Sequence, residues 1–470
     1  MTTRGWGKTL ESISALCYLW ERTPNMKVLV LTSKSAVGQW VSEFEKFTKG
    51  VATFQCRGTP TARGKIREKF LAASGPSVMV TGYRTAVQDL AELQDHSGWT
   101  LVLDEASAFK NAETQVHQVC KHLSSKADRT WALTATLIKN NLIEGWGVYG
   151  VVVPGLFGSK NHFMNTYCII RMMPIPKSRR QIPTIVGYRD KDIQEFRAKI
   201  DPYFLGRAKF EVASELPPLV TRYIKVQMNP IQEAKYQEAL DGLLLVGTKT
   251  GTTSEEKEVT KLTAVTYCQQ IVNHPSLIGV DGESEKLDAL IELLKDGDLE
   301  GDKVIVFSRF RKMIDLIVPA LKKAKIRSVR ITGAEDDKAR KIAQDDFQNP
   351  KSDALVCCIT MAASEAINLQ TAKAIIFYDT PWSAGDYLQI LGRMIRIGSV
   401  HDRCYAIHIT TEGTIDERVV KVLTKKMTLV EAVLGKRIKG DGDTGVTVDA
   451  SNDLSDLFDG LLQDARSRKS

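Results

Sequence analysis

Short runs of apolar residues alternate with amphipathic segments along most of the chain. Four such runs, rich in Val and Leu, lie at residues 27–32, 77–83, 100–106 and 129–136. Segments that we interpret as helices, such as residues 36–47, separate them. Strands that are continuously apolar are buried on both faces, so this alternation predicts an α/β fold with a doubly wound parallel sheet.

The pattern changes between about residues 154 and 282 and then resumes. The middle part contains a basic, proline-punctuated stretch at 172–183 and a helical stretch at 230–244, so we expect helical insertions and a connector. A second set of apolar runs follows at residues 303–308, 328–332, 354–360, 374–379 and 404–410. Two α/β units in one chain predict a cleft between them.

The end of the chain, residues 440–470, is rich in Asp, Gly and Ser. We expect most of this tail to be disordered because it has little apolar surface to bury. Residues 454–462 could form a short amphipathic helix that docks on a partner protein or on the body. A solvated tail end is the alternative.

Composition narrows the class of protein. The 470 residues exceed one ordinary core, and 43% hydrophobic with 26% charged residues is typical of a soluble globular protein. No apolar run is long enough to span a bilayer, and the N-terminal sequence lacks a secretory signal pattern, so we expect no membrane association. The net charge of +8 permits a polyanionic partner without proving one.

The eight cysteines are scattered along the chain and form no CxxC pair. This distribution argues for a reducing compartment and against a zinc site or a disulfide framework.

Residues 4–9, RGWGKT, precede a helix-like segment and are typical of a phosphate-binding loop. Glycines let the backbone approach a phosphate, and the positive end of a helix dipole attracts it. Lys8 would then reach the β- and γ-phosphates of a nucleotide, and Thr9 would bind Mg²⁺. The full pattern has a small residue six positions before the lysine, where this chain has Thr2, so a chance match is the alternative.

An acidic pair ends the apolar run at residues 100–106. In a Mg²⁺-dependent hydrolase, Asp104 would face the metal, and Glu105 would orient and deprotonate the attacking water. Capping of a following helix is the alternative for any single acidic pair. Together with the GKT sequence, the pair indicates a nucleotide hydrolase.

Two arginines in the second α/β unit are candidates to complete such a nucleotide-hydrolysing site. Arg393 and Arg396 are three positions apart, hence on the same face if this stretch is helical. Guanidinium groups are well suited to neutralise charge on a γ-phosphate during transfer. A basic surface helix is the alternative.

Taken in order, the motifs of this chain resemble those of the helicase-like ATPases of superfamily two, specifically the Swi/Snf type. That family includes chromatin remodellers and related bacterial and viral DNA translocases. The resemblance extends from residue 5 to about residue 436. It is carried by GWGKT (5–9), LVLTSKSAVGQWVSEFEKF (29–47), VTGYRTA (80–86), LDEASAFKN (103–111), LTATLIKNNLIEGW (133–146), RAKFEVASELPP (207–218), NHPSLI (273–278), SEKLDALIELL (284–294), KVIVFSRF (303–310), ITMAASEAINLQTA (359–372), YDTPWSAGDYLQILGRMIRIGS (378–399) and TIDERVVKVLTKK (414–426).

The resemblance implies two RecA-like lobes, with ATP between them and double-stranded DNA across both. Lobe 1 would span residues 1–210, with a helical protrusion at about 155–210. Lobe 2 would span 211–437, with a helical insertion at about 229–285 and a closing brace at about 414–437. An acidic tail would follow at 438–470.

The resemblance also implies a role for individual residues. The residues implied to bind ATP are Gly5, Gly7, Lys8, Thr9 and Gln389, and those implied to act in catalysis are Lys8, Asp104, Glu105, Arg393 and Arg396. Thr9 and Asp104 would bind Mg²⁺. The DNA backbone would be held near Ser33, Thr81, Arg309 and Thr360, without base specificity and with strong dependence on salt.

Several positions depart from the family pattern. Ser107 stands where His is common, Ser33 where Pro is usual, and Ala135 in place of Gly. The often glycine-rich motif near residue 363 carries Ala363, Ser364 and Ala366, and an alanine at a positive φ there would cost roughly 1 kcal/mol. The family also has a strand and an adenine-contacting segment before the phosphate loop, which the given sequence lacks. We therefore expect weak nucleotide affinity with poor base selectivity.

The sequence thus predicts an ATP-dependent translocase on double-stranded DNA, acting in repair, recombination, replication or protein displacement. A strand-separating DNA helicase or an RNA helicase is one alternative. A DNA-binding module with an impaired ATP site is another. We expect a monomer that could also contact single-stranded DNA or a protein through its tail. It would reside in bacterial or phage-infected cytoplasm, or in the nucleus if eukaryotic.

Overall fold

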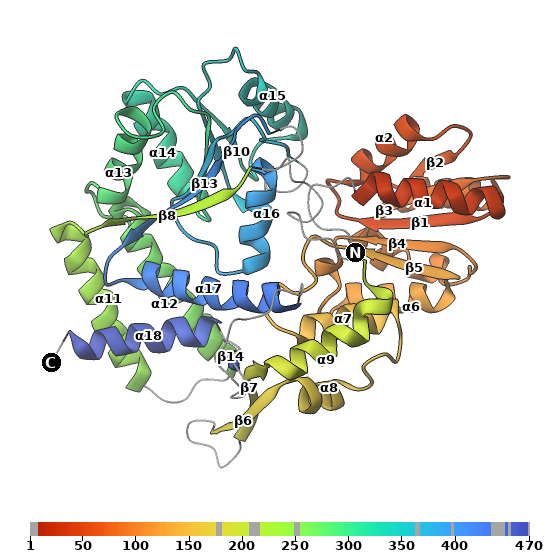
Figure 1. The fold of residues 1–470 in the computed structure, drawn as a ribbon, viewed down its shortest axis with the longest axis horizontal. Coiled ribbons are helices and arrows are strands. Elements are labelled where there is room, and N and C mark those ends of the chain that lie inside the picture. Colours follow the sequence, from red (N-terminus) through yellow and green to blue (C-terminus); the bar gives the residue numbers. More distant parts are fainter. Residues whose placement is uncertain are drawn as a thin grey trace. The chain divides into compact units, whose positions relative to one another are not determined.

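The computed structural model describes residues 8–174, 181–205, 217–248, 254–361, 367–395, 399–433, 447–449 and 453–468. The chain divides into two compact units (Figure 1). Unit 1 comprises Met1–Ser214 with Leu429–Val448, and unit 2 comprises Glu215–Thr428 with Asp449–Ser470. In the described parts of the chain, no helix has both the length and the apolar character needed to cross a bilayer.

Unit 1 contains a parallel five-stranded sheet in the order β2-β3-β1-β4-β5. Its strands are β1 (Lys27–Thr32), β2 (Ala52–Gln55), β3 (Ser77–Gly82), β4 (Thr100–Asp104) and β5 (Arg129–Leu133). The three central strands are almost wholly buried, which explains their continuous apolar sequence. The edge strand β2 was not predicted, because its side chains are only partly buried and its sequence, ATFQ, is weakly apolar.

Helices cover both faces of this sheet, as a doubly wound fold requires. Apolar residues of α1 (Lys8–Arg22) and α2 (Val37–Phe47) pack on alternate residues of the central strands, including Val28, Val30 and Val80. The helices α4 (Tyr83–Gln88) and α6 (Gln115–Lys126) contact the strands as well. The remaining elements of this part are α3 (Pro60–Ala72), α5 (Leu90–Leu93) and η1 (Ala106–Ala108).

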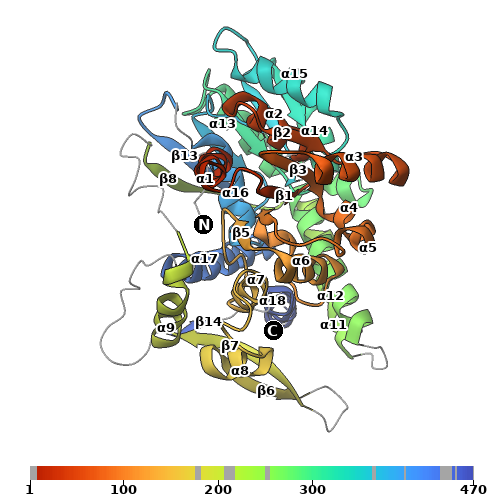
Figure 2. The same cartoon turned by 90° about the vertical axis from the view of Figure 1, so that its right-hand side faces the viewer.

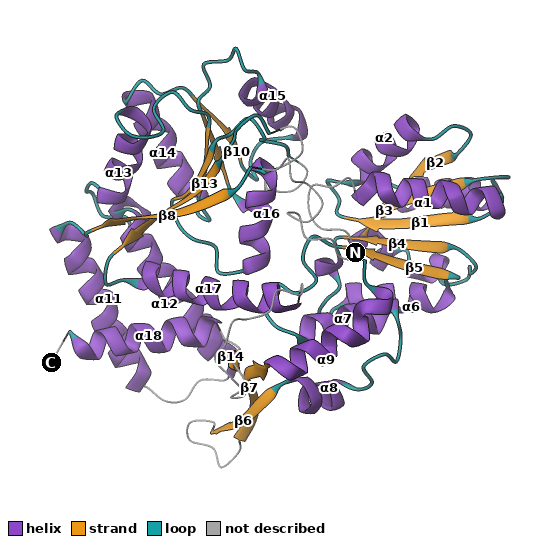
Figure 3. Ribbon diagram, viewed as in Figure 1, coloured by secondary structure: helices purple, strands orange, loops and turns teal. Residues whose placement is uncertain are grey.

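A helical subdomain with its own aromatic core extends unit 1. Its helices are α7 (Ile143–Val152), α8 (Lys160–Tyr167) and α9 (Asp190–Ile200), followed by η2 (Asp201–Tyr203). Phe157 packs against Phe163, Tyr167 and Phe196, with ring centroids 5.1 to 5.7 Å away. Where only helices were expected, β6 (Ile169–Pro174) and β7 (Gln181–Arg189) form an antiparallel hairpin, joined by β14 (Thr447–Asp449) in a small sheet (Figure 3).

Unit 2 contains a parallel six-stranded sheet in the order β10-β11-β9-β12-β13-β8. Its strands are β8 (Leu219–Val226), β9 (Val304–Phe307), β10 (Ser328–Ile331), β11 (Val356–Ile359), β12 (Ala374–Phe377) and β13 (Cys404–Thr411). Five of them confirm the predicted runs. The edge strand β8 was missed because half of its residues are polar and several are exposed. The predicted α/β class with two parallel sheets is confirmed.

Two layers of helices accompany the sheet of unit 2. Buried residues of α13 (Glu285–Lys295) and α14 (Arg311–Lys323) pack on the side chains of Val304, Val306 and Ile376. On the other face, Tyr387 of α16 (Ala384–Met394) packs against Phe377, with ring centroids 4.9 Å apart. The helix α15 (Asp337–Gln348) contacts β10.

A second helical layer in unit 2 is formed by α11 (Pro230–Thr248), α12 (Ser254–Asn273), η3 (Pro275–Ile278), the first turns of α17 (Ile415–Val433), and α18 (Asp453–Ser467). The last helix lies against α11 and α12 (Figures 1 and 2). Its buried face consists of Leu457, Phe458, Leu461 and Ala465, which recur at helical spacing.

The docking of α18 differs from the disorder expected for most of the tail. Besides the apolar face, the Arg418 guanidinium of α17 donates from Nε to Asp464 Oδ2 at 2.8 Å and pairs with Oδ1. A Cβ on Gly460 would lie 2.5 Å from Arg418 Nη1, so glycine allows the close approach of the two helices. The short amphipathic segment predicted at 454–462 lies within this helix.

Leu461→Ala should loosen the C-terminal helix. Leu461 is fully buried, and truncation of a buried leucine to alanine typically removes about 2 kcal/mol or more. If α18 opens locally, its amide hydrogens should exchange roughly 30-fold faster, which hydrogen–deuterium exchange with mass spectrometry can measure. The exposed Gln463→Ala is the matched control, and equal exchange in both variants would contradict the role of this face.

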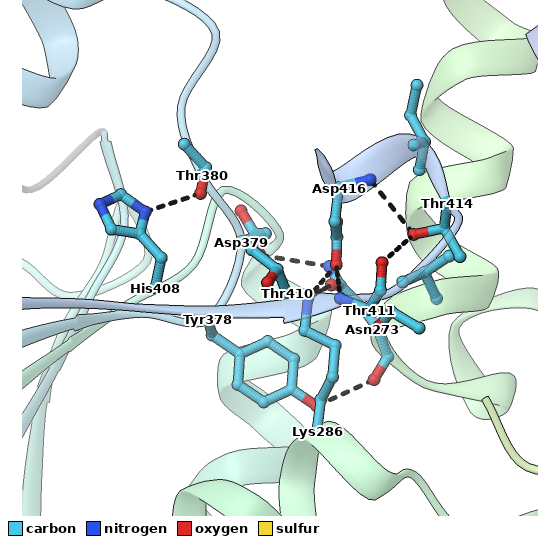
Figure 4. Close-up of polar contacts among 12 residues, drawn as sticks. Asn273, Lys286, Tyr378, Asp379, Thr380, His408, Thr410, Thr411, Thr414 and Asp416 are labelled. Atoms are coloured by element: carbon cyan, nitrogen blue, oxygen red, sulfur yellow. Dashed lines mark hydrogen bonds and ion pairs between the residues drawn. The ribbon is translucent and has the colours of Figure 1, made fainter. Parts of the chain in front are cut away.

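His408 is buried in the sheet of unit 2. Its ring stacks on that of Phe377, with ring centroids 4.8 Å apart. Its Nδ1 lies 2.9 Å from Thr380 Oγ1 (Figure 4). Burial lowers the pKa of His408 from 6.5 to about 4. Between these two pKa values, His408 stays neutral in the folded chain but takes up a proton in the unfolded chain. Acid should therefore destabilise unit 2.

The free energy of unfolding should fall by about 1 kcal/mol through His408 alone between pH 7.5 and 5.5. Stability from this group is complete above pH 7 and is lost progressively down to pH 4, since the folded pKa is the lower one. Urea denaturation at both pH values should show a smaller loss for His408→Phe than for the exposed control His162→Gln. An unchanged pH slope in His408→Phe would contradict this assignment.

Candidate functional site

The described part of the phosphate loop begins at Lys8, the first residue of α1. Lys8 and Thr9 lie in the first turn, at the positive end of the helix dipole, which favours an anion. The Ser12 hydroxyl donates to the Lys8 carbonyl at 2.7 Å and so stabilises this turn. Gly5 and Gly7 lie outside the described residues.

Asp104 is the last residue of β4 and accepts hydrogen bonds from donors on three other elements, β1, α2 and α4. Thr32 Oγ1, at the end of β1, donates to Asp104 Oδ2 at 2.8 Å, and Trp40 Nε1 of α2 donates to the same oxygen at 2.8 Å. Tyr83 OH donates to the Asp104 carbonyl oxygen at 2.7 Å. Burial raises the pKa of Tyr83 well above its usual value, so this phenol remains a donor.

Glu105 adopts a left-handed backbone conformation, with φ 58° and ψ 75°. Such a conformation is unfavourable for a residue with a Cβ and is found mainly where the surrounding structure enforces it. The Ser107 hydroxyl donates to Glu105 Oε1 at 3.0 Å, and Thr134 Oγ1 lies 3.4 Å from the same atom. Ser107, which replaces the His common in the family, thus helps to orient the neighbouring carboxylate.

The loop after β5 is organised by a buried glutamate of α7. Glu144 Oε2 accepts hydrogen bonds from the backbone N–H groups of Lys139, at 2.6 Å, and Asn140, at 3.2 Å. Lys110, which follows the acidic pair, forms an ion pair with Glu144. The segments after β4 and β5 are therefore joined through one carboxylate.

In unit 2, Gln389 and Arg393 lie on α16 and are partly buried. Arg393 Nη1 donates to the Ile367 carbonyl at 3.3 Å. The assumption of a continuous helix from Arg393 to Arg396 fails at Ile395, whose backbone is extended after the helix ends at Met394. Arg396 lies outside the described residues, as do Ala363, Ser364 and Ala366.

The residues expected to hold the DNA backbone are not all accessible. Thr81 is 2% exposed and its hydroxyl donates to the Cys56 carbonyl at 3.3 Å, and Thr360 is 5% exposed. These two side chains face the protein interior because each lies at the buried end of a parallel strand. Ser33 is half-buried. Exposed cationic side chains near the ends of β1 and β3 are Lys34 and Arg84, which the sequence motifs did not single out.

Arg309 is also engaged within unit 2 rather than free to meet a phosphate. Its Nη1 donates to Gln269 Oε1 at 2.8 Å, and its guanidinium carbon lies 4.1 Å from the centre of the Trp382 ring. Burial lowers the pKa of Arg309. The Arg309 backbone N–H donates to Asp379 Oδ1 at 2.7 Å, which fixes the segment after β9 to the segment after β12.

A buried polar network connects these segments to α12, α13 and α17 (Figure 4). Lys286 Nζ, 1% exposed, pairs with Asp416 Oδ2 at 2.8 Å and donates to Asn273 Oδ1 at 3.0 Å. Asn273 Nδ2 donates in turn to Asp379 Oδ2 at 3.2 Å. Burial raises the pKa of Asp379. Lys286 and Asp416 could not be assigned from sequence because they are 130 positions apart.

The residues at the end of β4 fit a magnesium–nucleotide site. Among the described residues, Asp104 Oδ1 accepts no hydrogen bond, so one carboxylate oxygen remains for a metal ligand. Magnesium bound beside a nucleotide commonly takes one or two protein ligands, with phosphates and water completing its shell. A single aspartate and the Thr9 hydroxyl are therefore a sufficient protein contribution.

Two family models match this chain. The family model of the SNF2-related domain matches residues 3–277, and that of the helicase conserved C-terminal domain matches residues 285–398. The chain is 26% identical over 449 residues to the ISWI chromatin-remodeling complex ATPase ISW1 of Saccharomyces cerevisiae. It is 28% identical over 450 residues to the ISWI chromatin-remodeling complex ATPase CHR17 of Arabidopsis thaliana.

These alignments cover 92% of this chain but only 38% and 40% of the two relatives. The chain thus spans about two-fifths of their length. Among solved structures, the Sulfolobus solfataricus SWI2/SNF2 ATPase core in complex with dsDNA is similar, with a TM-score of 0.40 and 23% identity. That comparison covers 92% of this chain and 87% of the other.

The backbone strain at Glu105 predicts an unusual order of stability. Glycine adopts the left-handed region without a Cβ clash, so Glu105→Gly should be more stable than Glu105→Ala by about 1 kcal/mol. In most positions alanine would be the more stable of the two. Urea denaturation followed by tryptophan fluorescence measures the difference, and an alanine variant at least as stable as the glycine variant would contradict it.

Proposed function

The chain belongs to the family of the SNF2-related domain, and from this membership we propose that it is a DNA-dependent ATPase that moves along double-stranded DNA. The observation that carries the proposal is the acidic pair at the end of β4. Asp104 is fixed by Thr32 and Trp40, and Glu105 is held in a strained conformation beside it. Strain and fixed orientation of this kind are characteristic of catalytic positions.

The roles proposed for unit 1 follow from the placement of its side chains. Lys8 and the first turn of α1 would bind the β- and γ-phosphates of ATP, and Thr9 and Asp104 would hold Mg²⁺. Magnesium, when bound, neutralises charge that develops on these phosphates. Glu105 would orient the attacking water and accept its proton, and Ser107 would keep that carboxylate in place.

In unit 2, Gln389, Arg393 and Arg396 are proposed to complete the nucleotide site, as the family resemblance implies. Arg393 lies near the end of α16, and its main-chain carbonyl accepts a hydrogen bond from Leu369 N at 3.0 Å. This contact fixes the end of α16 to the segment that follows the glycine-poor motif near residue 363. Movement of that segment would therefore displace Arg393.

Duplex DNA is the proposed partner, held through its phosphates. The exposed cations Lys34 and Arg84 follow the ends of β1 and β3, close to Thr32 and Tyr83, which donate hydrogen bonds to Asp104. Contacts of this kind carry no sequence information and release counterions, so binding should weaken steeply as salt is raised. The proposed outcome of hydrolysis is movement along DNA in repair, recombination, replication or displacement of bound proteins.

ATP hydrolysis by the intact chain should be stimulated severalfold by double-stranded DNA, and less by single-stranded DNA or RNA. Glu105→Gln should lower the rate at least a hundredfold, because positioned proton transfer commonly contributes that much. Lys8→Ala should abolish detectable hydrolysis. Steady-state phosphate release measures all of these, with the exposed Glu68→Gln as the matched control.

Each contrary result in this assay has a definite meaning. Stimulation chiefly by RNA would replace the DNA partner, and release of a labelled strand from a duplex would indicate a strand-separating helicase. Hydrolysis that is the same in the wild-type chain and in Glu105→Gln would overturn the proposed function. If DNA affinity were then the same with and without nucleotide, the chain would be a DNA-binding module.

A further inference from the structure

The strongest unassigned feature is the pair of buried donors on Asp104 Oδ2. Resting on the function proposed above, we infer that Trp40 and Thr32 are positioning residues for the magnesium-binding carboxylate. Their hydrogen bonds hold one oxygen of Asp104 inside unit 1, so that the other oxygen is presented to the metal. The indole N–H of Trp40 is the less expected member, because it belongs to the apolar face of α2.

Burial makes this arrangement specific. Trp40 is 2% exposed and Thr32 is 1% exposed, so neither donor can turn to solvent. If the Asp104 side chain rotated away from β1, two buried donors would lose their acceptor at once. The orientation with Oδ2 inward is therefore favoured before any metal binds.

The two donors come from elements whose positions are fixed independently of Asp104. β1 pairs with β4 in parallel register, with Leu31 opposite Leu103, which brings Thr32 beside Asp104. Trp40 is anchored by the core, where its ring packs against that of Phe44, with ring centroids 6.0 Å apart. The core of unit 1 thus fixes the direction of the carboxylate.

The same contacts join the metal site to the segments proposed to meet DNA. Thr32 directly precedes Ser33 and the exposed Lys34, and Tyr83, which donates to the Asp104 carbonyl oxygen, directly precedes the exposed Arg84. A shift of either segment would therefore displace a hydrogen-bond donor of Asp104.

Trp40→Phe and Thr32→Val test the inference with little change of shape. Phenylalanine keeps a ring against Phe44 but lacks the N–H, and valine keeps the branched side chain of threonine but lacks the hydroxyl. Mn²⁺ can replace Mg²⁺ as a probe, and electron paramagnetic resonance of free Mn²⁺ measures its Kd in the presence of ADP. Each variant should raise this Kd about tenfold or more, as loss of a hydrogen bond to a metal ligand commonly does.

Trp20→Phe is the matched control for loss of an indole N–H. Trp20 Nε1 donates to the Met26 carbonyl at 2.7 Å rather than to Asp104, and the ring is 4% exposed in the same apolar cluster. This variant should lower Tm comparably while leaving the Mn²⁺ Kd within about twofold. ADP binding in EDTA should be unchanged in all three variants, since a positioning role concerns the metal alone.

The outcomes separate this inference from the function on which it rests. An unchanged Mn²⁺ Kd in folded Trp40→Phe and Thr32→Val would overturn the positioning role, even if DNA-stimulated hydrolysis is observed. A raised Mn²⁺ Kd in both variants would support the positioning role, even if DNA fails to stimulate hydrolysis and the translocase proposal is rejected. A wild-type chain that binds no Mn²⁺ with ADP would overturn both.

Discussion

Parallel strand pairing is the constraint on which both units depend. All strands of a parallel sheet end at the same edge, so residues that follow different strands meet there even when they are far apart in sequence. In unit 1 this edge gathers Thr32, Asp104 and Thr134, and in unit 2 it gathers Ser308 and Asp379. Both sets are polar residues at the ends of apolar strands, which is where a buried sheet can first tolerate them.

Polar groups at such an edge must be paired, because an unpaired buried donor or acceptor costs about 1 to 3 kcal/mol. Each unit meets this requirement with one aspartate that accepts from neighbouring strand ends. Asp104 accepts from Thr32, and Asp379 accepts from Ser308 and from the Arg309 backbone. The two aspartates differ in whether a carboxylate oxygen remains without a hydrogen bond. Both oxygens of Asp379 are occupied, which suits a structural role, whereas Asp104 keeps one oxygen available among the described residues.

The sequence was sufficient for elements whose signal is local. Nine of the eleven strands in the two parallel sheets coincide with apolar runs, and the two that were missed, β2 and β8, are partly exposed edge strands with weak apolar patterns. The β6–β7 hairpin was missed because its basic, proline-rich sequence gives no alternating pattern. The tail helix was underestimated because its acidic composition indicates disorder unless a partner surface is known. That surface, on α11, α12 and α17, is formed by residues far away in sequence.

The candidate site shows the same division between local and distant signals. Motifs predicted roles for Lys8, Asp104 and Glu105 from residue type and spacing alone. They could not show that Thr81 and Thr360 are buried, since a motif does not report which way a side chain faces. Nor could they show that Thr32 and Trp40, 72 and 64 positions from Asp104, donate to one of its oxygens. Residues of a type suited to chemistry can be recognised one by one in a sequence. The residues that orient them are identified only from their contacts in the folded chain, so a motif underestimates how much of the chain a site requires.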